Sequence, residues 1–232
     1  MTNITFIALA YKMVALQLML GEANFFSKQL DLPTPHPIQI TNLIENHVSH
    51  PRFGFGGALG VTNFGFYFKQ GKLWSVSNQQ KQYGNWSAEW NKSPSLIDKE
   101  QAYQLTTQWL SAVFIDVPAL DKKFKVRVTQ PFHYNLPNSN NKEVLPVYEV
   151  KWGEEGHPAI NVTILGPTKE LMRLDINDLS FSKRPSLVIP NADELNSRPD
   201  PVFKKLQSAT VATNTEVIRL RSPKLQNGQS PR

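Results

Sequence analysis

One amphipathic helix constrains the fold of this chain more than any other segment. Asp98 is a good N-cap because its carboxylate can accept a hydrogen bond from the backbone N–H of Gln101, whose side chain can reach back to the N–H of Asp98. Glu100 adds negative charge to the first turn, where the helix dipole favours it. Apolar residues then recur at three- and four-residue steps, at Ala102, Leu105, Trp109 and Val113. The pattern predicts a core helix that ends before Pro118.

Strand-like runs lie on both sides of this helix. The downstream runs cover residues 124–130, 144–152, 159–165 and 171–176. The upstream runs cover residues 53–62, 64–69 and 72–77. Gln70-Gly71 has the composition of a hairpin turn between the last two of these. The strands should therefore pair as an antiparallel sheet.

A shorter helix is predicted upstream, over residues 40–48. Ile40, Leu43, Ile44 and Val48 would share one helical face, and Pro51 would mark the end of the helix. Each half of the chain then has a helix followed by strands. The predicted fold class is α+β, with helices packed on antiparallel sheet, and the order of elements allows two similar α-β-β-β halves.

Changes in composition divide the chain. Residues 33–94 are predicted as an N-terminal α+β half, residues 95–178 as a second α+β half, and residues 179–232 as a Pro-rich, basic and largely irregular tail. Residues 197–232 hold seven Lys and Arg residues against two acidic residues, which is +5 of the formal charge of +6. The basic residues are spread out and not interleaved with aromatic side chains, so no specific nucleic-acid partner is predicted. Attachment of the tail to anionic surfaces is an alternative.

The N-terminus is apolar but too short, and with Lys12 too charged, for a transmembrane span. Residues 13–20 have the length of the apolar part of a signal peptide, and Gly21 and Ala23 supply small residues before a cleavage point. Residues 1–23 are therefore predicted as a signal peptide, which implies a secreted or periplasmic protein. The alternative is an N-terminal helix packed on the domain of a cytoplasmic protein.

Three pieces of the second half carry a family resemblance. They are the helix opening Asp98-Lys99-Glu100-Gln101-Ala102, the strand at residues 147–152, and the turn Gly166-Pro167-Thr168-Lys169-Glu170. Together they resemble the PepSY-type module of secreted bacterial proteins, and the whole chain is similar to uncharacterised secreted proteins of environmental bacteria. The resemblance implies a PepSY-like or cystatin-like fold and a non-catalytic module that binds or restrains another protein, often a peptidase.

No catalytic or metal-binding motif is present in the sequence. The chain has no cysteine, which excludes thiolate metal sites and cysteine nucleophiles. His47 and His50 could meet on one helical face, but a zinc site needs further ligands, so neither a metal nor a cofactor is predicted. The alternative to a binding protein is a hydrolase whose residues come together only in the fold. The raw material for such a site is Asp116, Asp121, Glu149, Glu154 and His157.

Four aromatic residues are the candidate ligand-binding residues: Trp74, Tyr83, Trp86 and Trp90. Flat aromatic faces beside Asn and Gln donors suit an extended peptide or a polysaccharide. The alternative is that these side chains close the core between the two halves. The predicted function is that of a non-catalytic binding protein, whose partner is another protein, an extended peptide or a polysaccharide.

Overall fold

The computed structural model of the chain describes residues 3–49, 55–79, 94–130, 133–135, 142–144 and 146–189. They belong to one compact unit that ends at Ile189. The helices are α1 (Asn3–Gln29), α3 (Lys99–Ala112) and α4 (Val117–Lys123), with 3-10 turns η1 (Ile40–Asn42) and η3 (Leu179–Phe181). The first four strands are β1 (Leu43–Val48), β2 (Gly57–Val61), β3 (Phe64–Lys69) and β4 (Lys72–Asn78). The others are β5 (Arg127–Thr129), β6 (His133–Asn135), β7 (Lys142–Val144), β8 (Val147–Glu154), β9 (His157–Leu165) and β10 (Glu170–Ile176).

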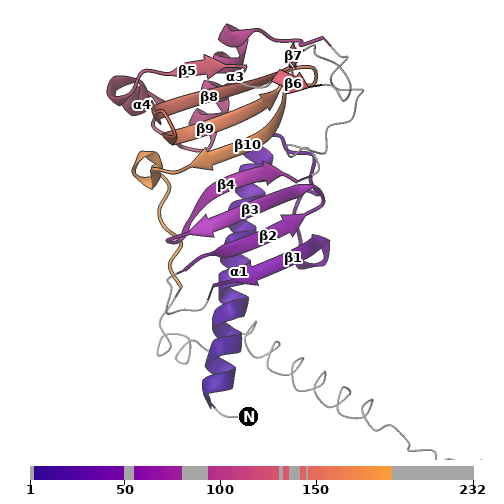
Figure 1. Cartoon of the computed structure of the whole chain (residues 1–232). Helices are drawn as coiled ribbons and strands as arrows, with labels where there is room; N and C mark the ends of the chain where they lie inside the picture. The colour runs from indigo at the N-terminus through magenta and orange to yellow at the C-terminus, as the bar shows by residue number, and fades with distance from the viewer. Residues whose placement is uncertain are drawn as a thin grey trace, which may run out of the picture. The chain divides into compact units, whose positions relative to one another are not determined.

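Eight of these strands form one antiparallel sheet in the order β1-β2-β3-β4-β10-β9-β8-β5 (Figure 1), and β6 and β7 form a separate two-stranded ribbon. The last strand of each half, β4 or β10, lies at the centre, where the two strands pair antiparallel. Their register aligns Ser75 with Asp175, Val76 with Leu174 and Ser77 with Arg173. The predicted α+β class, with helices packed on antiparallel sheet, is confirmed, and the two halves share a single sheet.

The core lies between the helices and one face of the sheet. In Figure 1, α1 and α3 lie behind the sheet, and no described helix covers the face toward the viewer. Side chains alternate in direction along a strand, so every second residue points to the helices. Buried strand residues of this core include Phe66, Val76, Val150, Val162 and Leu174. The helices contribute Met19, Phe26, Ala102 and Leu110. We call the opposite side the open face of the sheet.

The start of α3 is as predicted. Asp98 Oδ1 accepts a hydrogen bond from the N–H of Gln101 at 2.8 Å, and the Gln101 side chain accepts one from the N–H of Asp98 at 3.1 Å. Val113, just beyond the helix, is fully buried, and Leu105 and Trp109 pack against the core. The amphipathic pattern therefore identified the buried side of the helix.

The end of α3 differs from the prediction that Pro118 stops it. The helix already ends at Ala112, and Phe114 takes a left-handed conformation with φ of 61°. Pro118 lies in the first turn of α4, which the sequence did not predict. Proline is tolerated there because its missing N–H would have no partner within the helix. Asp116 caps α4 by accepting a hydrogen bond from the N–H of Ala119 at 3.2 Å.

The predicted helix over residues 40–48 is wrong, because most of this segment is strand β1. Leu43 and Val48 are half-buried against the core although they are five positions apart in the sequence. In a regular strand such a pair would face opposite sides. A bulge between Leu43 and Glu45 shifts the alternation by one residue, so both reach the core. Ile40 and Ile44, the other two residues of the predicted helical face, are exposed, so the spacing that predicted a helix does not coincide with the buried side chains of β1.

Helix α1 packs on the sheet through residues that were predicted as part of a signal peptide. Ala15, Met19 and Ala23 are fully buried, so residues from the predicted signal peptide belong to the core of this unit. Within the part of the chain that the structure describes, no helix combines the length and apolar character that crossing a bilayer would require. Cleavage after Ala23 is not tested by these contacts and stays a prediction.

Glu22 joins α1 to the segment that follows the sheet. Its carboxylate accepts two hydrogen bonds from the guanidinium of Arg184, at 2.6 and 2.5 Å. The same guanidinium lies 3.7 Å from the ring centroid of Phe25, which stacks on Phe114 at 5.8 Å. The unit therefore continues beyond the end of β10 to Ile189.

Glu22→Ala should lower the free energy of unfolding by about 3 kcal/mol, because it leaves the largely buried guanidinium of Arg184 without its carboxylate. Urea unfolding of the full chain measures this change. Glu100→Ala is the matched control, since it removes an exposed helical carboxylate and should cost less than about 0.5 kcal/mol. Equal unfolding of the two variants would contradict a stabilising role for the Glu22–Arg184 pair.

Candidate functional site

Two adjoining hollows lie where the β3–β4 turn, the β8–β9 turn and the end of β10 meet. The larger has a volume of about 560 Å³ and the smaller about 290 Å³. Both are lined by Asn177 and Asp178, which follow β10. The smaller hollow also has Lys69 and Trp74 from the first half of the chain, so it spans the seam between the halves. We call the two hollows together the seam groove.

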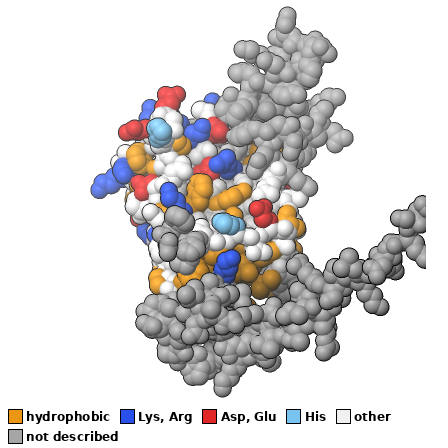
Figure 2. Space-filling model, turned by 60° about the horizontal axis from the view of Figure 1, so that its bottom comes forward, with side chains coloured by type: hydrophobic (Ala, Val, Ile, Leu, Met, Phe, Trp, Pro, Cys, Tyr) orange, Lys and Arg blue, Asp and Glu red, His pale blue; other side chains and the backbone are white. Residues whose placement is uncertain are grey.

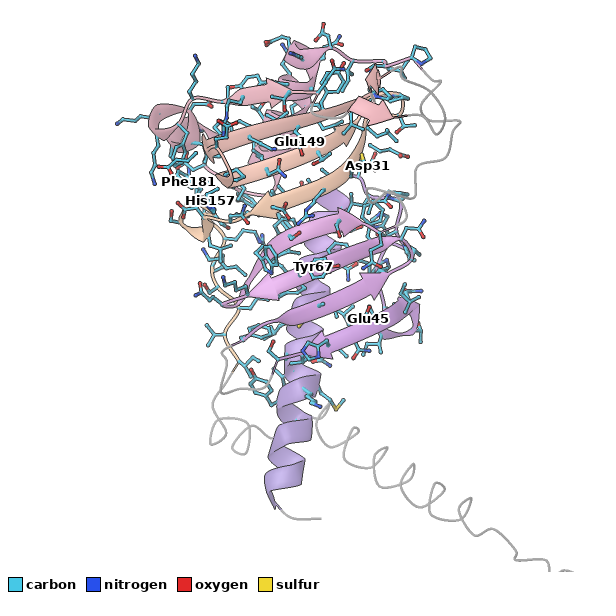
Figure 3. All side chains as sticks on the ribbon, in the orientation of Figure 1. Asp31, Glu45, Tyr67, Glu149, His157 and Phe181 are labelled. Carbon is cyan, nitrogen blue, oxygen red and sulfur yellow. The ribbon has the colours of Figure 1, made fainter. Side chains whose placement is uncertain are left out.

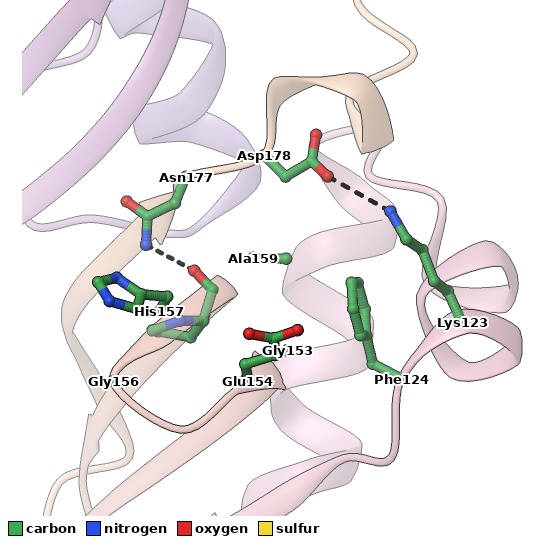
Figure 4. A pocket seen from close by; sticks show the side chains of 10 residues that line it. Lys123, Phe124, Gly153, Glu154, Gly156, His157, Ala159, Asn177 and Asp178 are labelled. Atoms are coloured by element: carbon green, nitrogen blue, oxygen red, sulfur yellow. Dashed lines mark hydrogen bonds and ion pairs between the residues drawn. The ribbon is translucent and has the colours of Figure 1, made fainter.

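The β8–β9 turn forms one wall of the larger hollow (Figure 4). Glu154 and His157 face each other across the turn, as the last pair of the β8–β9 ladder. Gly156 between them has a φ of 86°, a conformation that favours glycine. Asn177 Nδ2 donates a hydrogen bond to the carbonyl oxygen of Pro158 at 2.8 Å, which ties the end of β10 to the start of β9. The wall is therefore held by backbone pairing and by one side-chain bond.

Asp178 supplies a fixed negative charge to the groove. Its Oδ1 accepts hydrogen bonds from the hydroxyl of Ser180 at 2.6 Å and from the N–H of Ser180 at 3.1 Å. Lys123 Nζ lies 3.8 Å from Oδ2. The Ser180 hydroxyl first, and then its N–H and the charge of Lys123, lower the pKa of Asp178. The group is therefore a carboxylate near neutral pH and a poor proton donor.

Three other polar side chains of the groove are available to a ligand. Among the residues that the structure describes, the side chains of Lys69, Glu154 and His157 form no hydrogen bond or ion pair. Trp74 is half-buried and its ring centroid lies 6.3 Å from that of Tyr67. The groove thus combines one aromatic surface with side chains that can donate hydrogen bonds and side chains that can accept them.

Of the four predicted ligand-binding residues, the structure places only Trp74. Tyr83, Trp86 and Trp90 lie outside the described residues, so the predicted aromatic platform is not tested. Sequence reasoning missed Tyr67, the ring beside Trp74. The signal was available, because the Gln70-Gly71 hairpin brings β3 and β4 into register and sets Tyr67 opposite Ser75, next to Trp74.

The open face of the sheet is also polar, but its charged groups pair with one another. Asp175 accepts a hydrogen bond from the hydroxyl of Ser75 at 2.7 Å and pairs with Arg173 Nε at 2.7 Å. Lys151 pairs with Glu149 on β8. Figure 3 shows Glu149 and Tyr67 on this face of the sheet. Because these charges are already matched, the open face offers a ligand less than the groove does.

Most of the five residues considered as candidates for a hydrolase site make structural contacts instead. Asp116 caps α4 and pairs with Lys183 Nζ at 2.9 Å. Asp121 accepts hydrogen bonds from Trp152 Nε1 at 2.7 Å and from the Tyr103 hydroxyl at 3.2 Å. Glu149 belongs to the open face, as described above. The structure therefore brings together only two of these residues, Glu154 and His157.

No metal centre is formed by the described residues. A metal site at His47 and His50 required both histidines to lie on one face of a helix. His47 instead lies exposed on strand β1, and His50 is outside the described part of the chain. Within the described ranges, no group of three His, Asp or Glu residues could hold a metal ion.

A third hollow lies on the helix side of the seam, with a volume of about 260 Å³. Its walls are mainly apolar, from Leu30, Pro33, Leu105 and Trp109. This hollow lies between the residues that follow α1 and the β9–β10 turn. Trp109 is thus a residue of the packing between the halves, which is the role considered as the alternative for the other tryptophans.

No protein-family model matches the sequence, and comparison with curated proteins and with solved structures finds no match. The arguments about function therefore depend on the geometry of the chain itself.

Lowering the pH below about 4 should reduce the stability of the fold through Asp178 and Asp116. The pKa of Asp178 is lowered from its ordinary 3.8 mainly by Ser180, and that of Asp116 mainly by the hydrogen bond from Lys183. A carboxyl whose pKa is lower in the folded chain stabilises it above the unfolded pKa, and this contribution is lost as the pH falls through the folded value.

Thermal unfolding between about pH 2 and 6 measures the effect. Asp178→Asn keeps an acceptor for the Ser180 N–H but removes the titration, so its melting temperature should fall less steeply at acid pH. Asp116→Asn should act in the same direction. An unchanged slope in the double variant would contradict this assignment.

Proposed function

We propose that this chain is a non-catalytic binding protein that holds an extended segment of another protein in the seam groove. One observation carries the proposal. The half-buried ring of Trp74 lines the same groove as the side chains of Lys69, Glu154 and His157, whose polar groups have no partner among the described residues. An extended peptide offers carbonyl and N–H groups at short intervals, so it can use donors and acceptors along one groove.

The charge distribution of the described surface supports a protein partner. Lys and Arg side chains are interspersed with Asp and Glu side chains on the face shown in Figure 2, without a broad area of one sign. Polyanions such as nucleic acids are bound through clustered positive charge. A surface of mixed sign instead suits a polypeptide, whose own side chains carry both signs.

The groove supports binding more than catalysis. The lowered pKa of Asp178 makes this carboxylate a weak base toward the Ser180 hydroxyl, and among the described residues neither Glu154 nor His157 forms a side-chain hydrogen bond to a hydroxyl that could act as a nucleophile. Nucleophilic catalysis needs such a contact between the nucleophile and its base. The same conclusion is implied by the resemblance of residues 98–176 to PepSY-type modules, which predicts a module that binds or restrains another protein.

A secreted or periplasmic location remains part of the proposal. Export with cleavage after Ala23 would require the fold to form without part of α1. The unit would then lose Met19 from its core, and Arg184 would lose its partner Glu22.

Binding of labelled ten-residue peptides, followed by fluorescence anisotropy, tests the function, with soluble polysaccharides as the second panel. Trp74→Ala should weaken binding of a selected peptide at least tenfold, or by about 1.4 kcal/mol, because it removes the aromatic surface. Glu154→Gln should weaken binding of peptides with a basic residue. Glu155→Gln is the matched control, since this neighbour is 96% exposed and does not line the groove.

Equal effects of the two glutamine variants would remove Glu154 from the site. Binding of polysaccharides alone would replace the protein partner by a carbohydrate. Turnover of any ligand would contradict the non-catalytic proposal.

The state of the N-terminus has its own test. A chain that begins at Asn24 should unfold at a lower temperature than the full chain, because it lacks Ala15 and Met19 from the core. The mass of the protein recovered from its native host shows whether residues 1–23 are present. Equal melting of both forms would show that the fold does not depend on this part of α1.

A further inference from the structure

The two outer strands of the sheet differ in how they are protected. β5 has three residues and begins at Arg127, two residues after Lys125, and a short charged edge resists pairing with other chains. β1 has six residues and contains neither lysine nor proline. Among the described strands it pairs only with β2, so its outer edge presents backbone groups to a further strand.

Exposed apolar side chains accompany this edge. Ile40 is 53% exposed and Ile44 is 68% exposed. The bulge in β1 places Ile44 and Glu45 together opposite Gly60, on the open face. Single exposed hydrophobic residues are common on protein surfaces, but beside a strand edge that contains neither lysine nor proline they favour pairing.

Helix α1 continues beyond β1, as Figure 1 shows. Its 27 residues span about 40 Å, whereas the four strands of the first half extend across only about 19 Å. Between Ala10 and Met19, the half-buried side chains are Tyr11, Met13, Val14, Leu16 and Leu18. A helix that is apolar around most of its circumference is normally covered on more than one side. The covering surface would lie beyond β1, in line with the free edge.

We infer that β1 pairs antiparallel with β1 of a second copy of this chain, about a two-fold axis perpendicular to the sheet. This inference is independent of the seam groove. Such a contact joins the two sheets edge to edge and keeps both sets of helices on the same side.

Glu45 and His47 select one register for this contact, because a carboxylate can accept a hydrogen bond from an imidazole N–H. Side chains opposite each other in an antiparallel pair must lie on the same face, and Glu45 and His47 share the open face, with Asn46 between them pointing to the other. A two-fold axis can therefore pass beside Glu45, Asn46 or His47. The first choice sets two carboxylates opposite each other, and the third sets two imidazoles opposite each other. Only the axis beside Asn46 sets each Glu45 opposite the partner's His47.

The two α1 helices have room in this arrangement. Met19 Cε lies 2.9 Å from the position that a β-carbon on Gly57 would take, and Gly57 is opposite Val48 in the ladder. Helix α1 therefore crosses the edge near Val48, two residues from the proposed axis at Asn46. At about 3.4 Å per residue the two helices are separated along the strand by roughly 14 Å, slightly more than one helix diameter. They can pass side by side, with their half-buried apolar side chains between them.

A second copy accounts for more of these features than a lipid surface does. Lipid could cover the apolar part of α1, but it offers no ordered backbone groups to the edge of β1. It would also give no role to the alternation of Glu45 and His47.

Sedimentation equilibrium of the full chain tests the inference, at concentrations up to about 100 µM. The wild-type chain should be a dimer. Ile44→Lys should raise the dissociation constant at least about tenfold, because it places two like charges at the joined edges. Thr129→Lys, the corresponding change on β5, should leave the dissociation constant unchanged. Both side chains are exposed, so the variants should keep the wild-type melting temperature.

A charge exchange tests the register. His47→Glu alone and Glu45→His alone should each raise the dissociation constant about tenfold, because each sets like groups opposite each other. The double variant Glu45→His/His47→Glu restores opposite pairs and should return to within about twofold of the wild type. A double variant as weak as the single ones would overturn the register at Asn46.

A wild-type chain that stays monomeric at the highest concentration would overturn the dimer. A monomer that binds phosphatidylcholine vesicles would do the same and would identify lipid as the surface that covers α1. A dimer that Ile44→Lys leaves intact would show that the copies join elsewhere.

Discussion

The antiparallel pairing of β4 with β10 is the contact on which the rest of the fold depends. Alone, each half would be a small meander with a helix on one face and two free edges. The pairing removes two of the four edges and aligns the apolar faces of both halves, so that α1 and α3 close one core. Ser75 and Asp175 add a buried hydrogen bond across this seam. The end of the same seam, where Trp74 approaches Asn177, forms the groove.

Both halves run from a helix through their strands to the centre of the sheet, which is the arrangement that a two-fold axis between β4 and β10 would produce. A duplication remains a hypothesis, because no repeat of residues accompanies the repeat of topology. The arrangement has a physical consequence all the same. The first strand of each half must lie at an outer edge, and only β5 is short enough and charged enough to be protected there.

Local signals predicted much of the fold. Asp98 and Gln101 identified the start of α3 because a capping box needs only neighbouring residues. Gln70 and Gly71 identified a hairpin for the same reason, and both have positive φ, at 54° and 70°. The failure at residues 40–48 has a local cause as well: periodicity was the basis of the prediction, and two of the four apolar residues used for it, Ile40 and Ile44, are exposed.

The candidate site could be predicted only in part, because its residues meet through strand register. Trp74 was identified from its type, but Lys123, Glu154, His157 and Asp178 come from the end of α4, the β8–β9 turn and the segment after β10, which the sheet brings together, and a slip of one residue would separate them. Asp178 shows why such a site can still be stable without a ligand. Its bonds to Ser180 hold the start of η3, so the negative charge in the groove is fixed by the fold. A partner then meets a charge that is already in place, and the ordering of that side chain does not reduce the free energy of binding.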